Sequence, residues 1–214
     1  MDHFLYRDGA LYAEDVPVAE IAAEVGTPIK VSLDPKATVV RNATDYEPRG
    51  AVSGPLELAG DGLDLVAAEL DGAPLPDSAY EATPDSFVLK SPPKRRFELT
   101  LTTVVSPDDN TELMGLYRSN GVYCTQCEAE GFRRITYAYD RPDVLSTYDV
   151  WVLSDGSGEM ALLSNGNLAS AGELDGRPYA LWNDPFPKPT YLFALVAGAL
   201  GVVRDTFTTM SGRK

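Results

Sequence analysis

The sequence predicts a mainly β protein: a saddle-like, antiparallel β-sandwich domain preceded by a short N-terminal helix. Runs in which apolar and polar side chains alternate recur along most of the chain, and dipeptides typical of tight hairpin turns stand between them. One stretch near the N-terminus has helical periodicity instead. We therefore expect a helix-bearing extension over residues 1–31 and one β domain over residues 32–214.

The predicted helix covers the segment DVPVAEIAAEVG, residues 15–26. Asp15 is a good residue to cap its start, and Gly26 suits the left-handed conformation that ends many helices. Four apolar residues follow the spacing i, i+3, i+4, i+7, which places them on one face of a helix: Val18, Ile21, Ala22 and Val25.

The strands are predicted from the alternation of apolar and polar side chains. The segments RFELTLT (96–102) and STYDVWVL (146–153) each place an apolar residue at every second position. Four dipeptides predict hairpin turns because their residues tolerate positive φ: Asp71–Gly72, Asn120–Gly121, Asn165–Gly166 and Asp175–Gly176. Short strands with frequent turns favour a sandwich or saddle-shaped sheet over alternating β-α-β units.

The C-terminal part of the chain is predicted to contain a buried strand and several core side chains. The apolar run TYLFALVAGALGVV (190–203) is too short to span a bilayer and is interpreted as buried strand. NDPFPKP (183–189) predicts a rigid turn because proline fixes φ and restricts the residue before it. Five side chains are expected in or beside the core: Tyr191, Phe193, Leu195, Trp182 and Phe186.

Composition narrows the function classes. The 18 basic and 32 acidic residues give a net charge of −14, which repels phosphate backbones and anionic lipid, so we expect neither nucleic acid nor membrane as a partner. The same charge is compatible with cationic ligands such as the free amines of peptides. The N-terminus lacks the features of a secretory signal, and the two cysteines form no disulfide framework, so we expect a cytoplasmic protein.

The segment CTQCEAEGFRR, residues 124–134, carries the densest chemistry. Cys124 and Cys127 form a C-x-x-C pair, but acidic residues follow and would raise a thiol pKa, so a redox role is disfavoured. The only histidine is His3, so a zinc site within the chain, a Ser-His-Asp triad and an H-E-x-x-H helix are not expected. We therefore predict no catalytic residues and no cofactor in this chain.

Gln126 and Glu128 are the candidate binding residues. Two positions apart, they point to the same side if the segment is extended. An amide and a carboxylate can accept hydrogen bonds from an ammonium group, each charge-assisted bond contributing about 1.5–3 kcal/mol. The alternative is an internal ion network with arginines of the neighbourhood: Arg133, Arg134 or Arg141.

Several long strings resemble one family. They are GLYRSNGVYCTQCEAEGFRRITYAYDRPDVLSTYDV, LLSNGN, WNDPFPKPTYLFALVAG and RDTFTTMSGR, in this order. They are similar to the N-terminal β domain of the aminopeptidase N family of zinc aminopeptidases, in its bacterial alanyl-aminopeptidase branch. The resemblance runs from about residue 32 to the last residue and is densest from residue 113 onward.

The resemblance implies a β domain that packs on a catalytic metallopeptidase domain and covers one side of its active site. It implies that Gln126 and Glu128 help to bind the free amine of a peptide N-terminus, which fixes the peptide bond to be cleaved. The family's zinc, its H-E-x-x-H helix and its G-x-M-E-N loop lie in the catalytic domain, and this chain has neither motif. Alone, the domain is expected to be inactive.

Residues 1–31 depart from that family. They resemble the opening of diaminopimelate decarboxylase. That segment lacks the lysine that binds pyridoxal phosphate, so no cofactor is implied.

A second hypothesis for the β domain is a stand-alone interaction module without a peptidase role. The exposed surface around Gln126 and Glu128 distinguishes the two, because only the first requires those side chains to bind an amine.

Overall fold

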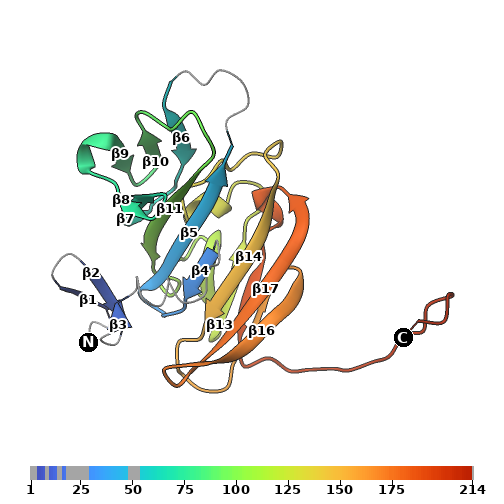
Figure 1. Ribbon diagram of the computed structural model, residues 1–214. Helices are drawn as coiled ribbons and strands as arrows, with labels where there is room; N and C mark the ends of the chain where they lie inside the picture. Colours follow the sequence, from blue (N-terminus) through green and yellow to red (C-terminus); the bar gives the residue numbers. More distant parts are fainter. Residues whose placement is uncertain (1–3, 8–9, 14–15, 18–28, 48–53, 214) are drawn as a thin grey trace.

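The computed structural model describes residues 4–7, 10–13, 16–17, 29–47 and 54–213 (Figure 1). The described chain is mainly β, as predicted, and contains only short 3-10 helices: η1 (Asp77–Ala79), η2 (Phe132–Arg134) and η3 (Thr190–Leu192). None of its helices is long and apolar enough to cross a membrane. Of the helix predicted over residues 15–26, only Val16–Pro17 is described, as strand β3; the rest lies outside the described residues.

An eight-stranded sheet organises the domain. In spatial order its strands are β16 (Asn167–Leu174), β17 (Arg177–Lys188), β14 (Ser146–Leu153), β4 (Ile29–Ser32), β5 (Thr38–Tyr46), β11 (Phe97–Val105), β7 (Asp64–Leu70) and β8 (Ala73–Pro74). Its pairs are antiparallel except β14 and β4, which run parallel. The sheet is therefore mixed at this one pair and otherwise antiparallel, so the predicted antiparallel pairing holds for its other pairs.

Three smaller sheets complete the described strands. One contains β6 (Leu56–Ala59), β10 (Ser86–Leu89) and β9 (Tyr80–Thr83). A four-stranded sheet contains β12 (Gly115–Ser119), β13 (Val122–Gln126), β18 (Leu195–Gly198) and β15 (Ala161–Ser164). The third is formed by β1 (Phe4–Arg7), β2 (Ala10–Ala13) and β3 (Val16–Pro17).

Two hydrophobic cores join the large sheet to its neighbours. Val31 and Val152 of the large sheet pack in one core with Tyr123 and Leu195 of the four-stranded sheet. The second core joins strands β11 and β7 to the sheet of β6, β10 and β9. Because successive residues alternate between faces, the strand registers place both cores on the same face of the large sheet.

The predicted strands over 96–102 and 146–153 are found as β11 and β14. Three of the turn dipeptides close hairpins: β7–β8, β12–β13 and β16–β17. Asn165–Gly166 does not, because β15 and β16 belong to different sheets. Asp71, Asn120 and Asp175 have φ near +50°, as tight hairpin turns require.

The segment 183–189 is not a turn, which corrects the prediction. Residues 183–188 lie within β17, where the prolines are tolerated for two reasons. The ladder with β14 is irregular between Ser146 and Tyr148, and pairing with β16 ends at Asn183, so Pro185 and Pro187 remove few ladder hydrogen bonds.

The core prediction for the aromatic residues is largely confirmed. Phe193 and Leu195 are buried, Trp182 packs against the first core, and Tyr191 is half-buried. Phe186 is 73 % exposed, so its assignment to the core was wrong. The apolar run 190–203 forms one buried strand, β18, and continues into an exposed tail that contains Val202 and Val203.

Candidate functional site

The site is a tight turn at the end of the β12–β13 hairpin. Gln126 is the last residue of β13, and the chain then turns through residues 127–131 into η2. The N–H of Gly131 donates to the carbonyl of Cys127 at 2.9 Å. A Cβ at Gly131 would lie 2.3 Å from the carbonyl oxygen of Gln126. Only glycine lets the chain fold back this closely on the candidate residues.

Gln126 and Glu128 are both exposed, and Cys127 between them is buried. The side-chain amide of Gln126 donates to the backbone carbonyl of Glu128 at 3.4 Å, so the two residues are connected through the turn. The peptide bond after Glu128 is cis. Within the described chain, the Glu128 carboxylate makes no hydrogen bond or ion pair. Its oxygens are free to accept hydrogen bonds from a ligand.

The arginines considered as partners are paired with other acids. Arg133 contacts Glu130 at 3.2 Å and the buried Asp140 at 3.0 Å. Arg134 contacts Asp61 at 2.6 Å and Glu112 at 2.7 Å. Arg141 pairs with Asp143. Among the described residues, the internal ion network therefore exists but leaves out Glu128.

Asp140 is the structurally important acid that sequence reasoning missed. Its carboxylate is fully buried and accepts hydrogen bonds from the backbone N–H of Arg133 at 3.1 Å and the hydroxyl of Thr190 at 2.5 Å. It thereby joins η2, which follows the candidate turn, to η3. Within ITYAYDRPD no local pattern distinguishes Asp140 from a surface acid, so only the tertiary contacts find it.

Comparison with known proteins shows which family the chain belongs to, by sequence and by fold. Residues 66–192, more than half of the chain, match the peptidase M1 N-terminal domain. The chain belongs to the peptidase M1 N-terminal domain family.

The curated relatives of this M1 N-terminal domain are much longer than the chain. Aminopeptidase N of Caulobacter vibrioides is 48 % identical over 88 % of this chain, and aminopeptidase N of Escherichia coli is 47 % identical over 85 %. The chain spans 22 % and 21 % of these relatives' lengths, about a fifth. The domain is therefore similar to one part of each of those proteins.

Solved structures agree with this assignment. Legionella pneumophila aminopeptidase A, solved in complex with aspartic acid, superposes with a TM-score of 0.79 at 35 % identity. The match covers 86 % of this chain and 22 % of that one. An M1 zinc metallopeptidase from Deinococcus radiodurans, 18 % identical, gives a TM-score of 0.70 over 85 % of this chain and 44 % of its own, which supports the fold.

The described residues of this M1 N-terminal domain do not fit a zinc site. Nowhere in its described part do three or more His, Cys, Asp or Glu side chains gather in a way that could hold a metal ion. Zinc requires three or four such ligands. We derive no metal-dependent step from these residues, and the chemistry that the site supports is hydrogen bonding to a ligand.

Both cysteines are free thiols, Cys127 buried and Cys124 half-buried. Cys127 belongs to the first core, where burial and the nearby Asp140 raise the pKa of its thiol to about 12. Burial also raises the pKa of the half-buried Cys124 thiol. Because the thiolate is the nucleophile, raised pKa values lower the reactivity of both residues, the reverse of what dithiol catalysis requires.

We expect Cys127 in the native protein to react with Ellman's reagent at mildly alkaline pH more than about a hundredfold slower than a free cysteine. A pKa of about 12 leaves a very small thiolate fraction at that pH. Cys124 should react with an intermediate rate, and both thiols should react rapidly in denaturant. Rapid native labelling of both cysteines would reinstate the redox hypothesis.

Proposed function

We propose that this chain is the substrate-amine-binding and active-site-covering domain of an aminopeptidase N-like zinc peptidase that releases N-terminal amino acids from peptides, and that it is inactive alone. One observation carries the proposal: Gln126 and Glu128 stand exposed on one tight turn, and the Glu128 carboxylate has no partner in the described chain. The aminopeptidase relatives support the choice of a peptide as ligand.

The role of this site is to position a peptide more than to bind it tightly. An ammonium group donates hydrogen bonds, and a carboxylate and an amide carbonyl on one turn can accept them together. The close approach at Gly131 and the buried Cys127 keep the backbone of the turn beside β13, so the two residues that carry the acceptors are held near each other before a ligand arrives. In a complete enzyme, anchoring the amine in this way would place the first peptide bond over the catalytic metal of the partner domain.

The binding part is tested by titrating the chain with alanine amide and following backbone and side-chain amide signals by NMR. We expect shifts at Gln126 and Glu128 that are absent with N-acetylalanine amide, which has no ammonium group. Glu128→Gln should weaken binding by about 1.5–3 kcal/mol, roughly 10- to 150-fold in Kd. Glu130→Gln is the matched control, since Glu130 pairs with Arg133.

Equal binding of both ligands, or unchanged binding by Glu128→Gln, would contradict an amine-binding role and favour a stand-alone interaction module.

The proposed role in covering the active site is tested separately. The chain is mixed with a catalytic metallopeptidase domain of an aminopeptidase N, and cleavage of dipeptides is assayed. Increased cleavage supports the covering role, and absence of a complex contradicts it.

A further inference from the structure

The four-stranded sheet carries a row of apolar side chains on its outward face. Leu116, Tyr123 and Leu162 belong to the first core, so the residues next to them in their strands point to the opposite, outward side. Four outward residues lie directly opposite one another across all four strands: Tyr117, Cys124, Val196 and Leu163. We call these four residues the outer row.

Solvent reaches every member of the outer row. Leu163 is 41 % exposed, and the other three side chains are half-buried: Tyr117, Cys124 and Val196. Neighbouring strands lie about 4.8 Å apart, so the row is continuous and about 14 Å long. A continuous apolar row gains free energy when another apolar surface covers it.

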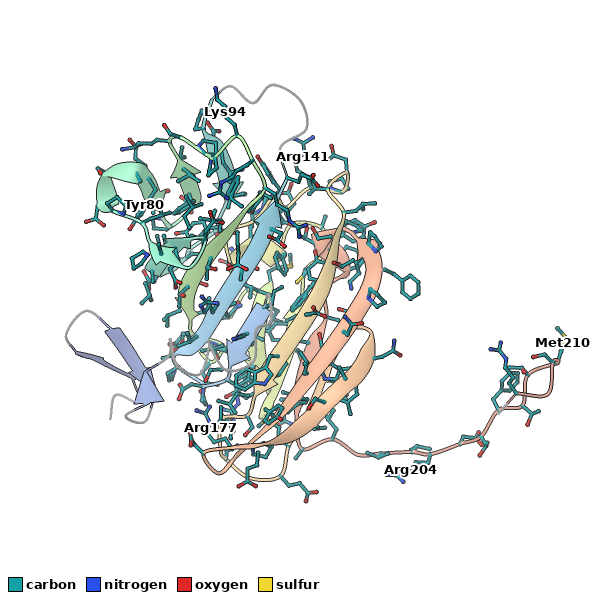
Figure 2. The ribbon with its side chains drawn as sticks, viewed as in Figure 1. Tyr80, Lys94, Arg141, Arg177, Arg204 and Met210 are labelled. Carbon is teal, nitrogen blue, oxygen red and sulfur yellow. The ribbon has the colours of Figure 1, made fainter. Side chains whose placement is uncertain are left out.

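The C-terminal tail leaves the outer row uncovered. Within the described chain, the backbone of residues 200–208 makes no hydrogen bond to any of the sheets. Figures 1 and 2 show that the tail, with Arg204 and Met210, runs away from the sheets. A second molecule is therefore a better candidate than the tail to cover the row.

The surroundings of the outer row lack charged side chains. The next outward positions along the four strands are all uncharged: Ser119, Val122, Gly198, Ala161, Gly115 and Gln126. The whole chain, by contrast, has a net charge of −14, which makes two copies repel each other over most of their surface. At the outer row, two copies can meet without placing one acidic residue against another.

We propose that this chain forms a dimer in which the outer rows of two copies pack face to face. The same surface is used by both copies, so the contact closes on itself about a two-fold axis. A row of four side chains is small beside a standard interface, so we expect a weak dimer with a Kd in the micromolar range or above. The proposal does not depend on amine binding by Gln126 and Glu128.

Sedimentation velocity over a range of concentrations tests whether the dimer forms. We expect the wild type to dimerise and Leu163→Glu to weaken association at least about tenfold, because it brings two carboxylates into an apolar contact. Leu168→Glu is the matched control, since it adds the same charge at a residue of the large sheet that is 53 % exposed. A wild type that stays monomeric at about 1 mM, or equal effects of the two variants, overturns the proposal.

The salt dependence gives a second test. Raising the NaCl concentration from about 0.05 to about 0.5 M should strengthen association, because salt screens the repulsion between two copies that each carry a charge of −14. An interface built on ion pairs would respond in the opposite way. Association that weakens as salt is added contradicts packing through the uncharged outer row.

Cys124 reports which surface is covered. We expect its rate of alkylation by iodoacetamide, measured by mass spectrometry, to fall as the dimer fraction rises and to stay constant in Leu163→Glu. A dimer in which Cys124 reacts as fast as in the monomer overturns the proposal. A chain that stays monomeric, but whose Cys124 is protected by an added catalytic metallopeptidase domain, would assign the outer row to that domain and likewise overturn the dimer.

Discussion

Replacing Asp140 by alanine is expected to destabilise the domain by about 3–5 kcal/mol, because one partner of a buried ion pair is removed. Asp140 is fully buried and accepts hydrogen bonds from Arg133 and Thr190. Without it the Thr190 hydroxyl and the backbone N–H of Arg133 lose their partners. Equilibrium unfolding in urea, followed by the fluorescence of Trp151 and Trp182, measures the change.

Two variants make this prediction specific. Asp140→Asn keeps the shape and an acceptor oxygen, so it should cost less than alanine but still reduce stability. Asp143→Ala is the surface control, because Asp143 pairs with Arg141 while both side chains are more than half exposed. Exposed pairs contribute about 0–1 kcal/mol. If Asp140→Ala costs no more than Asp143→Ala, the buried acid does not support the site.

The elements predicted correctly are those that local chemistry determines. Alternation in 146–153 required only neighbouring residues, and the structure has a strand with these bounds. Asn120–Gly121 and Asp175–Gly176 predicted hairpins because few residues adopt positive φ at low cost, and these positions do. Interactions within a few residues thus carry enough information for turns and alternating strands.

The elements predicted wrongly depend on long-range partners. The parallel pairing of β14 with β4 joins residues 150–153 to residues 29–32, and no local pattern encodes that choice. Pro185 and Pro187 suggested a turn, yet they lie in β17 where one neighbour has already ended. Whether a proline breaks a strand depends on the neighbouring strands, which the local sequence does not reveal.

At the candidate site too, some residues could be predicted from the sequence and others could be found only in the structure. Gln126 and Glu128 could be chosen from the sequence because the C-T-Q-C-E-A-E segment resembles a family motif. The support beneath them could not, because Asp140 and Thr190 reach η2 through tertiary contacts. That the Glu128 carboxylate has no partner among the described residues also required the structure, since the sequence offered three nearby arginines as partners and the structure pairs each with another acid.

Replacing Phe132 by alanine is expected to cost about 3–5 kcal/mol, since a buried aromatic side chain leaves a cavity that its neighbours only partly fill. Phe132 is 3 % exposed and packs edge-to-face against Phe193 at 5.1 Å and Tyr148 at 6.2 Å between ring centroids. It follows Gly131 directly, so it anchors the candidate turn to the first core. The free energy of unfolding in urea measures the cost.

Phe186→Ala is the matched control, because Phe186 is 73 % exposed and a surface substitution should stay within about 0.5 kcal/mol of the wild type. Phe132→Leu retains most of the buried volume and should fold well enough for the alanine amide titration. If the turn depends on this anchor, Phe132→Leu should weaken amine binding although residue 132 touches no ligand. Unchanged binding in this variant would mean that Gly131 and the β13 ladder alone are sufficient to hold Gln126 and Glu128 in place.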